Sequence, residues 1–171
     1  GNPALTHVVV AVLEEPERRE LAGRVLEEYV GRQEAGEPPE RLALSMKQLA
    51  ESHPRFLPLQ KLVVQLLRDL GRYDDATVIA TRAMESFPEA VEPAWMAAEA
   101  LAAAGRWSEA LVVAREWRQR SSLRPLAADL LIAEARFQAG DAEQAVEELE
   151  PHLERALTDP DRYASVLLSA V

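Results

Sequence analysis

Four glycines recur along this chain at an almost constant interval. Gly36, Gly71, Gly105 and Gly140 are separated by 35, 34 and 35 residues. The last three begin similar phrases, GRYDDA, GRWSEA and GDAEQA. A fixed period of this length is typical of stacked repeats, in which neighbouring copies bury each other's apolar faces. The residues that flank each glycine have helical spacing, so we predict a repeating unit made of a helix, a glycine turn and a second helix.

The composition fits such an array and limits the kinds of partner. The chain has 171 residues, of which 48% are hydrophobic, enough for one repeat domain over residues 1–171 with a continuous core. Its formal net charge of −10 argues against a nucleic-acid partner, because phosphate binding depends on clustered Lys and Arg. No apolar run approaches the roughly 18 residues that a membrane-spanning helix needs, so we expect a soluble protein without membrane insertion. Without cysteine the redox compartment stays open, and cytoplasm and periplasm are both compatible with the sequence.

Helical segments alternate with turns along the whole chain. Several prolines stand near the start of an apolar-periodic segment, where a missing N–H costs nothing. Asp141 and Gln144 have the spacing of a capping box, whereas Pro151 lies inside a helical segment and predicts a kink or break there. We predict an all-α fold, an αα-hairpin solenoid of about eight to ten helices. The helices are expected at residues 3–14, 17–35, 40–52, 58–70, 73–87, 93–104, 107–120, 125–139, 142–157 and 161–170.

The repeats resemble the tetratricopeptide repeat family, whose motif is about 34 residues long. That motif has glycine at the turn, an aromatic residue two positions later, and small residues where its two helices cross. HEAT-like or irregular helical arrays are the alternative, but their periods are longer, about 40 residues or more. The matching residues are Gly71, Tyr73, Ala76, Ala80 and Pro88 in 57–90, Ala94, Ala98, Leu101, Gly105, Trp107, Ala110 and Ala114 in 91–125, and Ala133, Gly140 and Ala145 in 126–159.

The resemblance is uneven along the chain. Residues 17–56 match the motif only loosely, and residues 160–171 correspond to the first helix of an incomplete further unit. The resemblance implies a right-handed superhelix in which small residues let the helices cross closely. The alanines expected to be buried at these crossings are Ala76, Ala98, Ala110, Ala133 and Ala145.

No catalytic constellation is evident in the sequence. The histidines His7, His53 and His152 lie on different expected elements, without a second ligand at metal spacing, and we interpret each as solvated or capping. The pair Glu147 and Glu148 points to different helix faces and is interpreted as solvated. Four of the seven glycines serve repeat turns, which leaves no glycine-rich phosphate loop. We therefore predict neither an enzyme nor a bound cofactor or metal.

The family resemblance directs attention to the concave face, which the first helix of each repeat lines. On each of these helices the residues at i, i+4 and i+7 share one face. Aromatic side chains beside fixed charges are typical of peptide recognition, although packing between repeats would explain Trp95 or Phe137 equally well. The expected partner-binding residues are Lys61, Gln65, Arg68, Trp95, Glu99, Leu130, Glu134 and Phe137.

These observations predict a non-catalytic scaffold that binds a peptide or protein segment in its concave groove. The alternative is a structural or oligomerisation segment of a larger multidomain protein. Val8 to Leu13 and Val166 to Val171 would leave apolar surface uncovered at the ends of the array. We accordingly expect either a piece of a longer array or self-association through the terminal helices.

Overall fold

The structure is a computed structural model, and it describes residues 23–24, 29, 31, 36, 38–121 and 126–158. Within these ranges the chain forms seven α-helices and no β-strand. The chain divides into two compact units, Gly1–Pro88 and Glu89–Val171. The all-helical class is therefore confirmed for the described residues. One continuous superhelical domain over both units stays a prediction.

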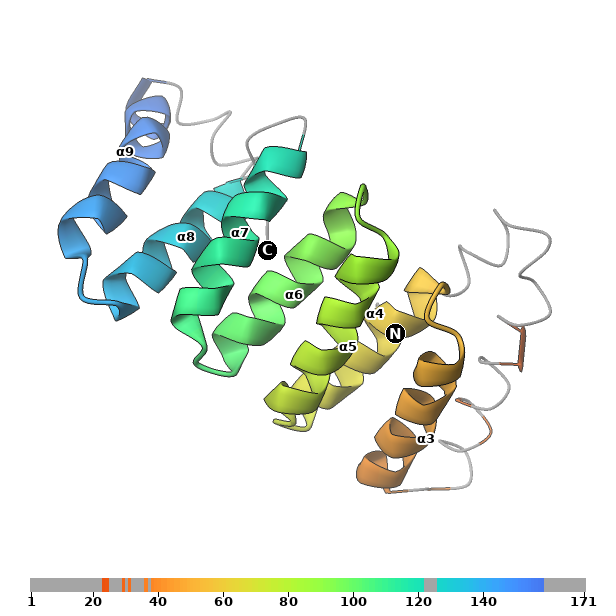
Figure 1. Ribbon diagram of the computed structural model, residues 1–171. Helices are drawn as coiled ribbons and strands as arrows, with labels where there is room; N and C mark the ends of the chain where they lie inside the picture. Colours follow the sequence, from red (N-terminus) through yellow and green to blue (C-terminus); the bar gives the residue numbers. More distant parts are fainter. Residues whose placement is uncertain are drawn as a thin grey trace. The chain divides into compact units, whose positions relative to one another are not determined.

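The first unit contains three described helices, α3 (Pro39–Ser52), α4 (Leu57–Asp69) and α5 (Tyr73–Ser86). A short turn joins α4 to α5, so these helices pack as an antiparallel hairpin, and α3 packs against both of them (Figure 1). Prolines open two of the helices, because Pro39 is the first residue of α3 and Pro58 the second residue of α4.

A buried amide closes the joint between α3 and α4. The side chain of Gln60 is only 2% exposed. Its Nε2 atom donates hydrogen bonds to the carbonyl oxygens of Ala50 and His53, both at 2.9 Å. These carbonyls lie at the end of α3 and also accept hydrogen bonds from the backbone N–H groups of His53 and Phe56, respectively. The polar side chain therefore stabilises the joint instead of being an uncompensated buried group.

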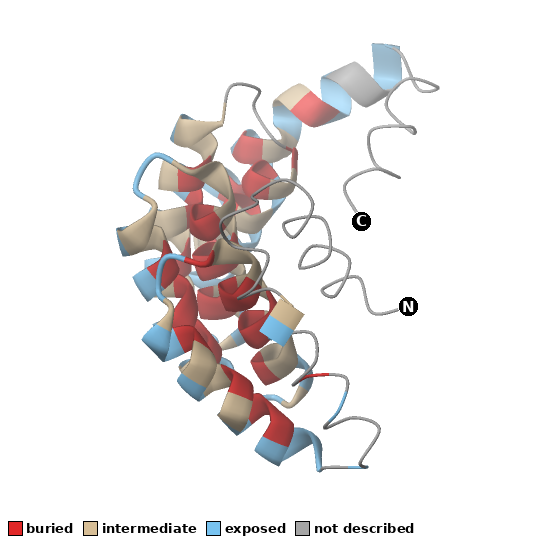
Figure 2. Cartoon of the chain, turned by 90° about the vertical axis from the view of Figure 1, so that its right-hand side faces the viewer, coloured by how far each residue is buried: buried red, intermediate tan, exposed pale blue. Residues whose placement is uncertain are grey.

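The second unit contains α6 (Val91–Ala103), α7 (Trp107–Arg120), α8 (Leu126–Gln138) and α9 (Ala142–Thr158). Each helix packs against the next one along the chain, and α8 also packs against α6. The α8 helix thus lies over the α6–α7 hairpin, as stacked repeats require. Buried residues, red in Figure 2, gather on the sides where the helices meet.

Seven of the expected helices agree with the observed ones to within two residues at each end. The expectation of eight to ten helices is not met by the seven that the described residues contain. The segments 3–14 and 161–170 lie outside the described residues, as does most of 17–35. The two ends of the predicted array therefore stay predictions.

The repeat glycines have the backbone conformation that their spacing suggests. Gly71, Gly105 and Gly140 have φ values of 68°, 72° and 85°, in the left-handed region that other residues avoid. At each turn the residue after glycine donates its N–H to a carbonyl five positions earlier, at 2.8, 2.9 and 3.0 Å. The glycine N–H bonds three positions back in all three turns. These bonds form a Schellman motif, which ends the first helix of each hairpin.

The small residues of the repeat motif lie in the core as predicted. Ala76, Ala98 and Ala110 are completely buried, and Ala133 and Ala145 are 4% and 7% exposed. Their burial agrees with the close helix crossings that the sequence predicts.

Two local predictions at α9 are met only in part. Asp141 accepts a hydrogen bond from the backbone N–H of Gln144 at 3.4 Å, as in a capping box. The second hydrogen bond of a capping box would run from the backbone N–H of Asp141 to the Gln144 side chain. Here the Gln144 side chain instead accepts a hydrogen bond from Arg136. Of the kink or break expected at Pro151, the break is wrong, since α9 continues through this residue to Thr158, and the kink stays a prediction.

An ionic contact joins α3 to α5 in the first unit. Asp75, in the first turn of α5, pairs with Lys47 of α3 and with Arg72 of its own turn. The hydrogen bond from Lys47 is the main cause that lowers the pKa of Asp75 below its ordinary value. A lowered carboxyl pKa stabilises the fold above the unfolded-state pKa, near 4, and this contribution is lost as the pH falls through the folded-state pKa.

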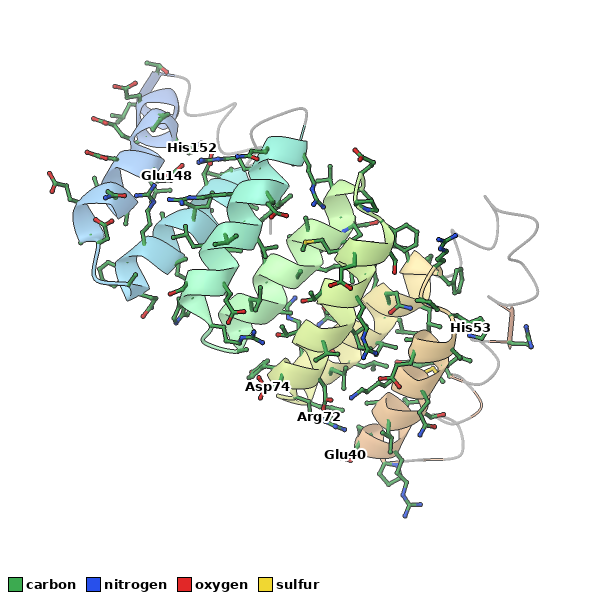
Figure 3. All side chains as sticks on the ribbon, in the orientation of Figure 1. Glu40, His53, Arg72, Asp74, Glu148 and His152 are labelled. Carbon is green, nitrogen blue, oxygen red and sulfur yellow. The ribbon has the colours of Figure 1, made fainter. Side chains whose placement is uncertain are left out.

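Replacing Asp75 by Asn should lower the free energy of unfolding by about 1 kcal/mol at pH 7. The difference from wild type should shrink below about pH 4, where the wild-type carboxylate becomes protonated as well. Urea unfolding between pH 3 and pH 7 measures both effects. Asp74→Asn is the matched control, because Asp74 is the exposed neighbour and forms no ion pair with a described residue (Figure 3). An Asp75→Asn effect equal to the control at pH 7 would contradict the role of the contact.

Candidate partner-binding surface

The first unit presents its three expected partner-binding residues on α4. Lys61, Gln65 and Arg68 are all partly exposed, as side chains on the outer face of the helix should be. Gln65 donates a hydrogen bond to Asp69 one turn later, at 2.6 Å. The α4 face is therefore polar and offers charged and amide groups to a partner.

The second unit holds the other five residues, on α6 and α8. Trp95 and Glu99 of α6 are half-buried, whereas Glu134 of α8 is exposed. The apolar side chains of Leu130 and Phe137, also on α8, are 44% and 63% exposed. Because α6 and α8 pack together, these residues belong to neighbouring helices of one unit. A continuous surface that also includes the α4 residues stays a prediction.

An apolar hollow with a volume of about 480 Å³ lies between α8 and α9. Glu134 is the only charged residue among those that line it. The hollow brings together three residues that the sequence singled out and a set from α9 that it did not. Its lining consists of Leu130, Ala133, Glu134 and Phe137 from α8 and Ala142, Ala145, Val146 and Leu149 from α9.

The α9 side of this surface continues beyond the hollow. Val146, Leu153 and Leu157 are 64%, 58% and 84% exposed, and Leu149 is partly exposed. We call these four residues the α9 stripe. Their spacings of three and four residues place them on one helix face. This spacing was present in the sequence, but the family resemblance directed attention to the first helix of each repeat and α9 is a second helix.

The preceding repeat shows what normally covers such a surface. Leu149 and Val146 lie 35 residues after Ala114 and Leu111, the equivalent positions of α7. Ala114 is completely buried and Leu111 is partly buried in the hairpin against which α8 packs. Leu149 is only partly buried and Val146 is exposed. The surface between α8 and α9 is therefore equivalent to the surface on which α6 and α7 accommodate a helix.

Behind this surface, α7, α8 and α9 share a buried ionic network. Asp129 of α8 is completely buried and pairs with Arg118 of α7 at 3.1 Å and with His152 of α9 at 2.7 Å. Arg118 also pairs with Glu148 of α9, which lies 3.5 Å from Arg136. Figure 3 labels Glu148 and His152 on α9. Burial by itself would lower the pKa of Arg118, but its hydrogen bonds and attraction to Asp129 and Glu148 raise it, so the guanidinium stays charged.

This network corrects two interpretations of the sequence. His152 is 5% exposed and Glu148 is 9% exposed, so neither is solvated. His53 does contact the end of its helix as expected, with Nδ1 3.1 Å from the carbonyl oxygen of Leu49. His7 lies outside the described residues. The described residues contain no group of three His, Cys, Asp or Glu side chains that could hold a metal ion.

Comparisons with known proteins agree with this geometry. Residues 67–121 match the family model described as tetratricopeptide repeat. This segment is therefore similar to tetratricopeptide repeats. The resemblance seen in the sequence is thereby confirmed, in the segment where the glycine turns and buried alanines are most regular. No curated protein sequence matches the chain.

Three solved structures share the fold. MamA of MSR-1 has a TM-score of 0.62 at 15% identity, over 90% of this chain and 92% of its own. MamA of Desulfovibrio magneticus RS-1 has a TM-score of 0.62 at 11% identity, over 93% and 98%. MamA of AMB-1 has a TM-score of 0.59 at 17% identity, over 80% and 72%. At these identities the likeness concerns the fold alone.

Among the helices that the structure describes, none combines the length and the apolar character that crossing a bilayer requires.

Proposed function

We propose that this tetratricopeptide-repeat chain is a non-catalytic scaffold that binds a segment of another protein. The single observation that carries the proposal is the apolar hollow between α8 and α9, beside which Phe137 is 63% exposed. An exposed aromatic side chain next to a concave apolar surface offers the large contact area on which protein recognition depends. The family, whose repeats serve mainly in protein interactions, is consistent with this role.

In the proposed complex the apolar and the charged side chains contact different groups of the partner. Leu130 and Phe137 bury apolar side chains of the partner, and Trp95 extends this contact onto α6. Glu99 and Glu134 pair with basic groups of the partner. On α4, Lys61 and Arg68 pair with acidic groups of the partner and Gln65 forms hydrogen bonds with it.

Phe137→Ala should weaken binding of the natural partner about tenfold, because a central aromatic contact contributes more than 1 kcal/mol. The partner is first captured from lysate on the immobilised chain and identified, and its affinity is then measured by isothermal titration calorimetry. Val112→Ala is the matched control, since Val112 is 57% exposed but lies on α7 outside the hollow.

Circular dichroism should show the same helical signal for Phe137→Ala and wild type, because the side chain is mostly exposed. Trp95→Ala tests the α6 side in the same assay. Unchanged partner affinity in Phe137→Ala, or an equal loss in Val112→Ala, would exclude the hollow as the binding surface.

The alternative role, as a structural or self-associating segment, uses the same apolar surface. The exposed Leu153 and Leu157 favour it, since two apolar stripes can cover each other. Light scattering over a concentration series would then show a dimer that Leu153→Asp abolishes.

A further inference from the structure

We propose that the segment bound at this surface is a basic amphipathic helix of the partner protein. Its apolar face would lie on the hollow and the α9 stripe, and its Lys and Arg side chains would lie opposite a row of glutamates on α9. This inference rests on the proposed function and identifies the chemistry of the partner.

The shape of the surface favours a helix as the ligand. The α9 stripe runs from Val146 to Leu157, which is about 16 Å along a helix at 1.5 Å per residue. A ligand helix of three turns has about the same length, and apolar residues at spacings of three and four residues would give it one face to lie on this stripe. The equivalent surface of the preceding hairpin, on α6 and α7, accommodates the helix α8. A surface of this kind therefore has a shape that fits a helix. In Figure 2 the last turns of α9 include pale blue, exposed residues.

The charged residues beside the α9 stripe indicate which charge the ligand carries. Glu143, Glu147, Glu150 and Glu154 are all exposed, and their spacings of four, three and four residues place them in one row. At about 100° per residue this row borders the α9 stripe on the side away from the buried His152. None of these four glutamates forms an ion pair with a described residue, whereas Glu148, on the inner face, is held by Arg118.

Two other occupants fit this charge pattern less well. A second copy of the chain would bring the same row of glutamates, and the chain has a formal net charge of −10. Residues 161–171 contain one basic residue, Arg162, and one acidic residue, Asp161, so they offer no excess of positive charge. A separate basic helix satisfies both the apolar stripe and its acidic border.

The test uses the full chain and two synthetic peptides of about 18 residues, long enough to form the helical turns required. Both peptides have Leu at i, i+3, i+4 and i+7. One has Lys and the other Glu at the flanking positions. Fluorescence anisotropy at about 0.15 M salt, where long-range charge effects are screened, should show at least tenfold tighter binding of the Lys peptide.

Charge reversal on the chain locates the contact. The double variant Glu147→Lys with Glu150→Lys should weaken binding of the Lys peptide about tenfold, because favourable contacts become repulsive. The matched control, Glu85→Lys with Glu89→Lys, makes the same change of net charge at exposed positions outside α9 and should bind as wild type does. Equal losses in the two double variants would overturn the proposal.

The remaining outcomes separate this inference from the proposed function. Equal binding of both peptides that is weakened by Phe137→Ala would overturn the basic partner and leave the scaffold function intact. Peptide binding that Phe137→Ala does not weaken would overturn both this inference and the proposed function. Binding of the Lys peptide only after Leu167→Ser with Leu168→Ser would identify the chain's own segment as the occupant, and a dimer lost in Leu153→Asp would identify a second copy. Either result would overturn the proposal.

Discussion

Replacing Asp129 by Ala should lower the free energy of unfolding by about 3 kcal/mol. Asp129 is completely buried in α8 and contacts both Arg118 of α7 and His152 of α9. Without this carboxylate the guanidinium of Arg118 loses one of its two acidic partners while most of it stays out of water. Removing one member of a buried ionic network is far more costly than removing an exposed charge, because the remaining charge stays desolvated.

Chemical unfolding followed by circular dichroism measures this difference. Glu134→Ala is the matched control, because Glu134 lies on the same helix and is exposed, and it should change the free energy of unfolding by no more than about 0.5 kcal/mol. If Asp129→Ala and Glu134→Ala had equal stability, the network would contribute nothing to the fold of the second unit.

Ala110→Leu should destabilise the fold by about 2 kcal/mol. Ala110 of α7 is completely buried, and so is Ala98 of α6, the helix that α7 packs against. A closely packed helix crossing has no room for three additional carbon atoms, so α6 and α7 must separate or the new side chain must adopt a strained rotamer.

A thermal melt compares this variant with Ala103→Leu. Ala103 is the last residue of α6 and is exposed, so the larger side chain finds room there. A melting temperature of Ala110→Leu at or above that of wild type would show that the crossing is loose, contrary to the complete burial of Ala110.

The helices could be predicted from the sequence because their ends depend on local signals. Pro39 and Pro58 begin helices, and the left-handed glycines at 71, 105 and 140 end them. Each of these residues acts through its own backbone, whatever it packs against. The buried alanines were predictable for a related reason, since the repeat period relates them to one another: Ala76, Ala110 and Ala145 are 34 and 35 residues apart, and Ala98 and Ala133 are 35 apart.

The surface was predicted only on its α8 side. Leu130, Glu134 and Phe137 were anticipated, but the α9 stripe depends on which helix faces stay uncovered, and packing decides this over many residues of separation. The ionic network escaped prediction for the same reason. Nothing local distinguishes the buried Glu148 from the exposed Glu147, and Glu148 gains its partners only from the approach of Arg118, 30 residues away, and Arg136. A break at Pro151 was wrongly allowed for, because α9 continues despite the missing N–H.

The three Schellman turns have a consequence for how such a chain can change its length. Each turn uses the same two hydrogen bonds and the same left-handed glycine, at nearly equal intervals. Duplication or deletion of one whole period therefore places a hairpin beside another hairpin that has the equivalent packing positions. Each inserted residue then packs as its equivalent in the neighbouring repeat does. Adding or removing a few residues inside a hairpin rotates one helix face relative to the other and moves the glycine away from the only position that requires it. Gene duplication can lengthen a chain of this kind in whole hairpins, while smaller insertions are confined to the connections between them.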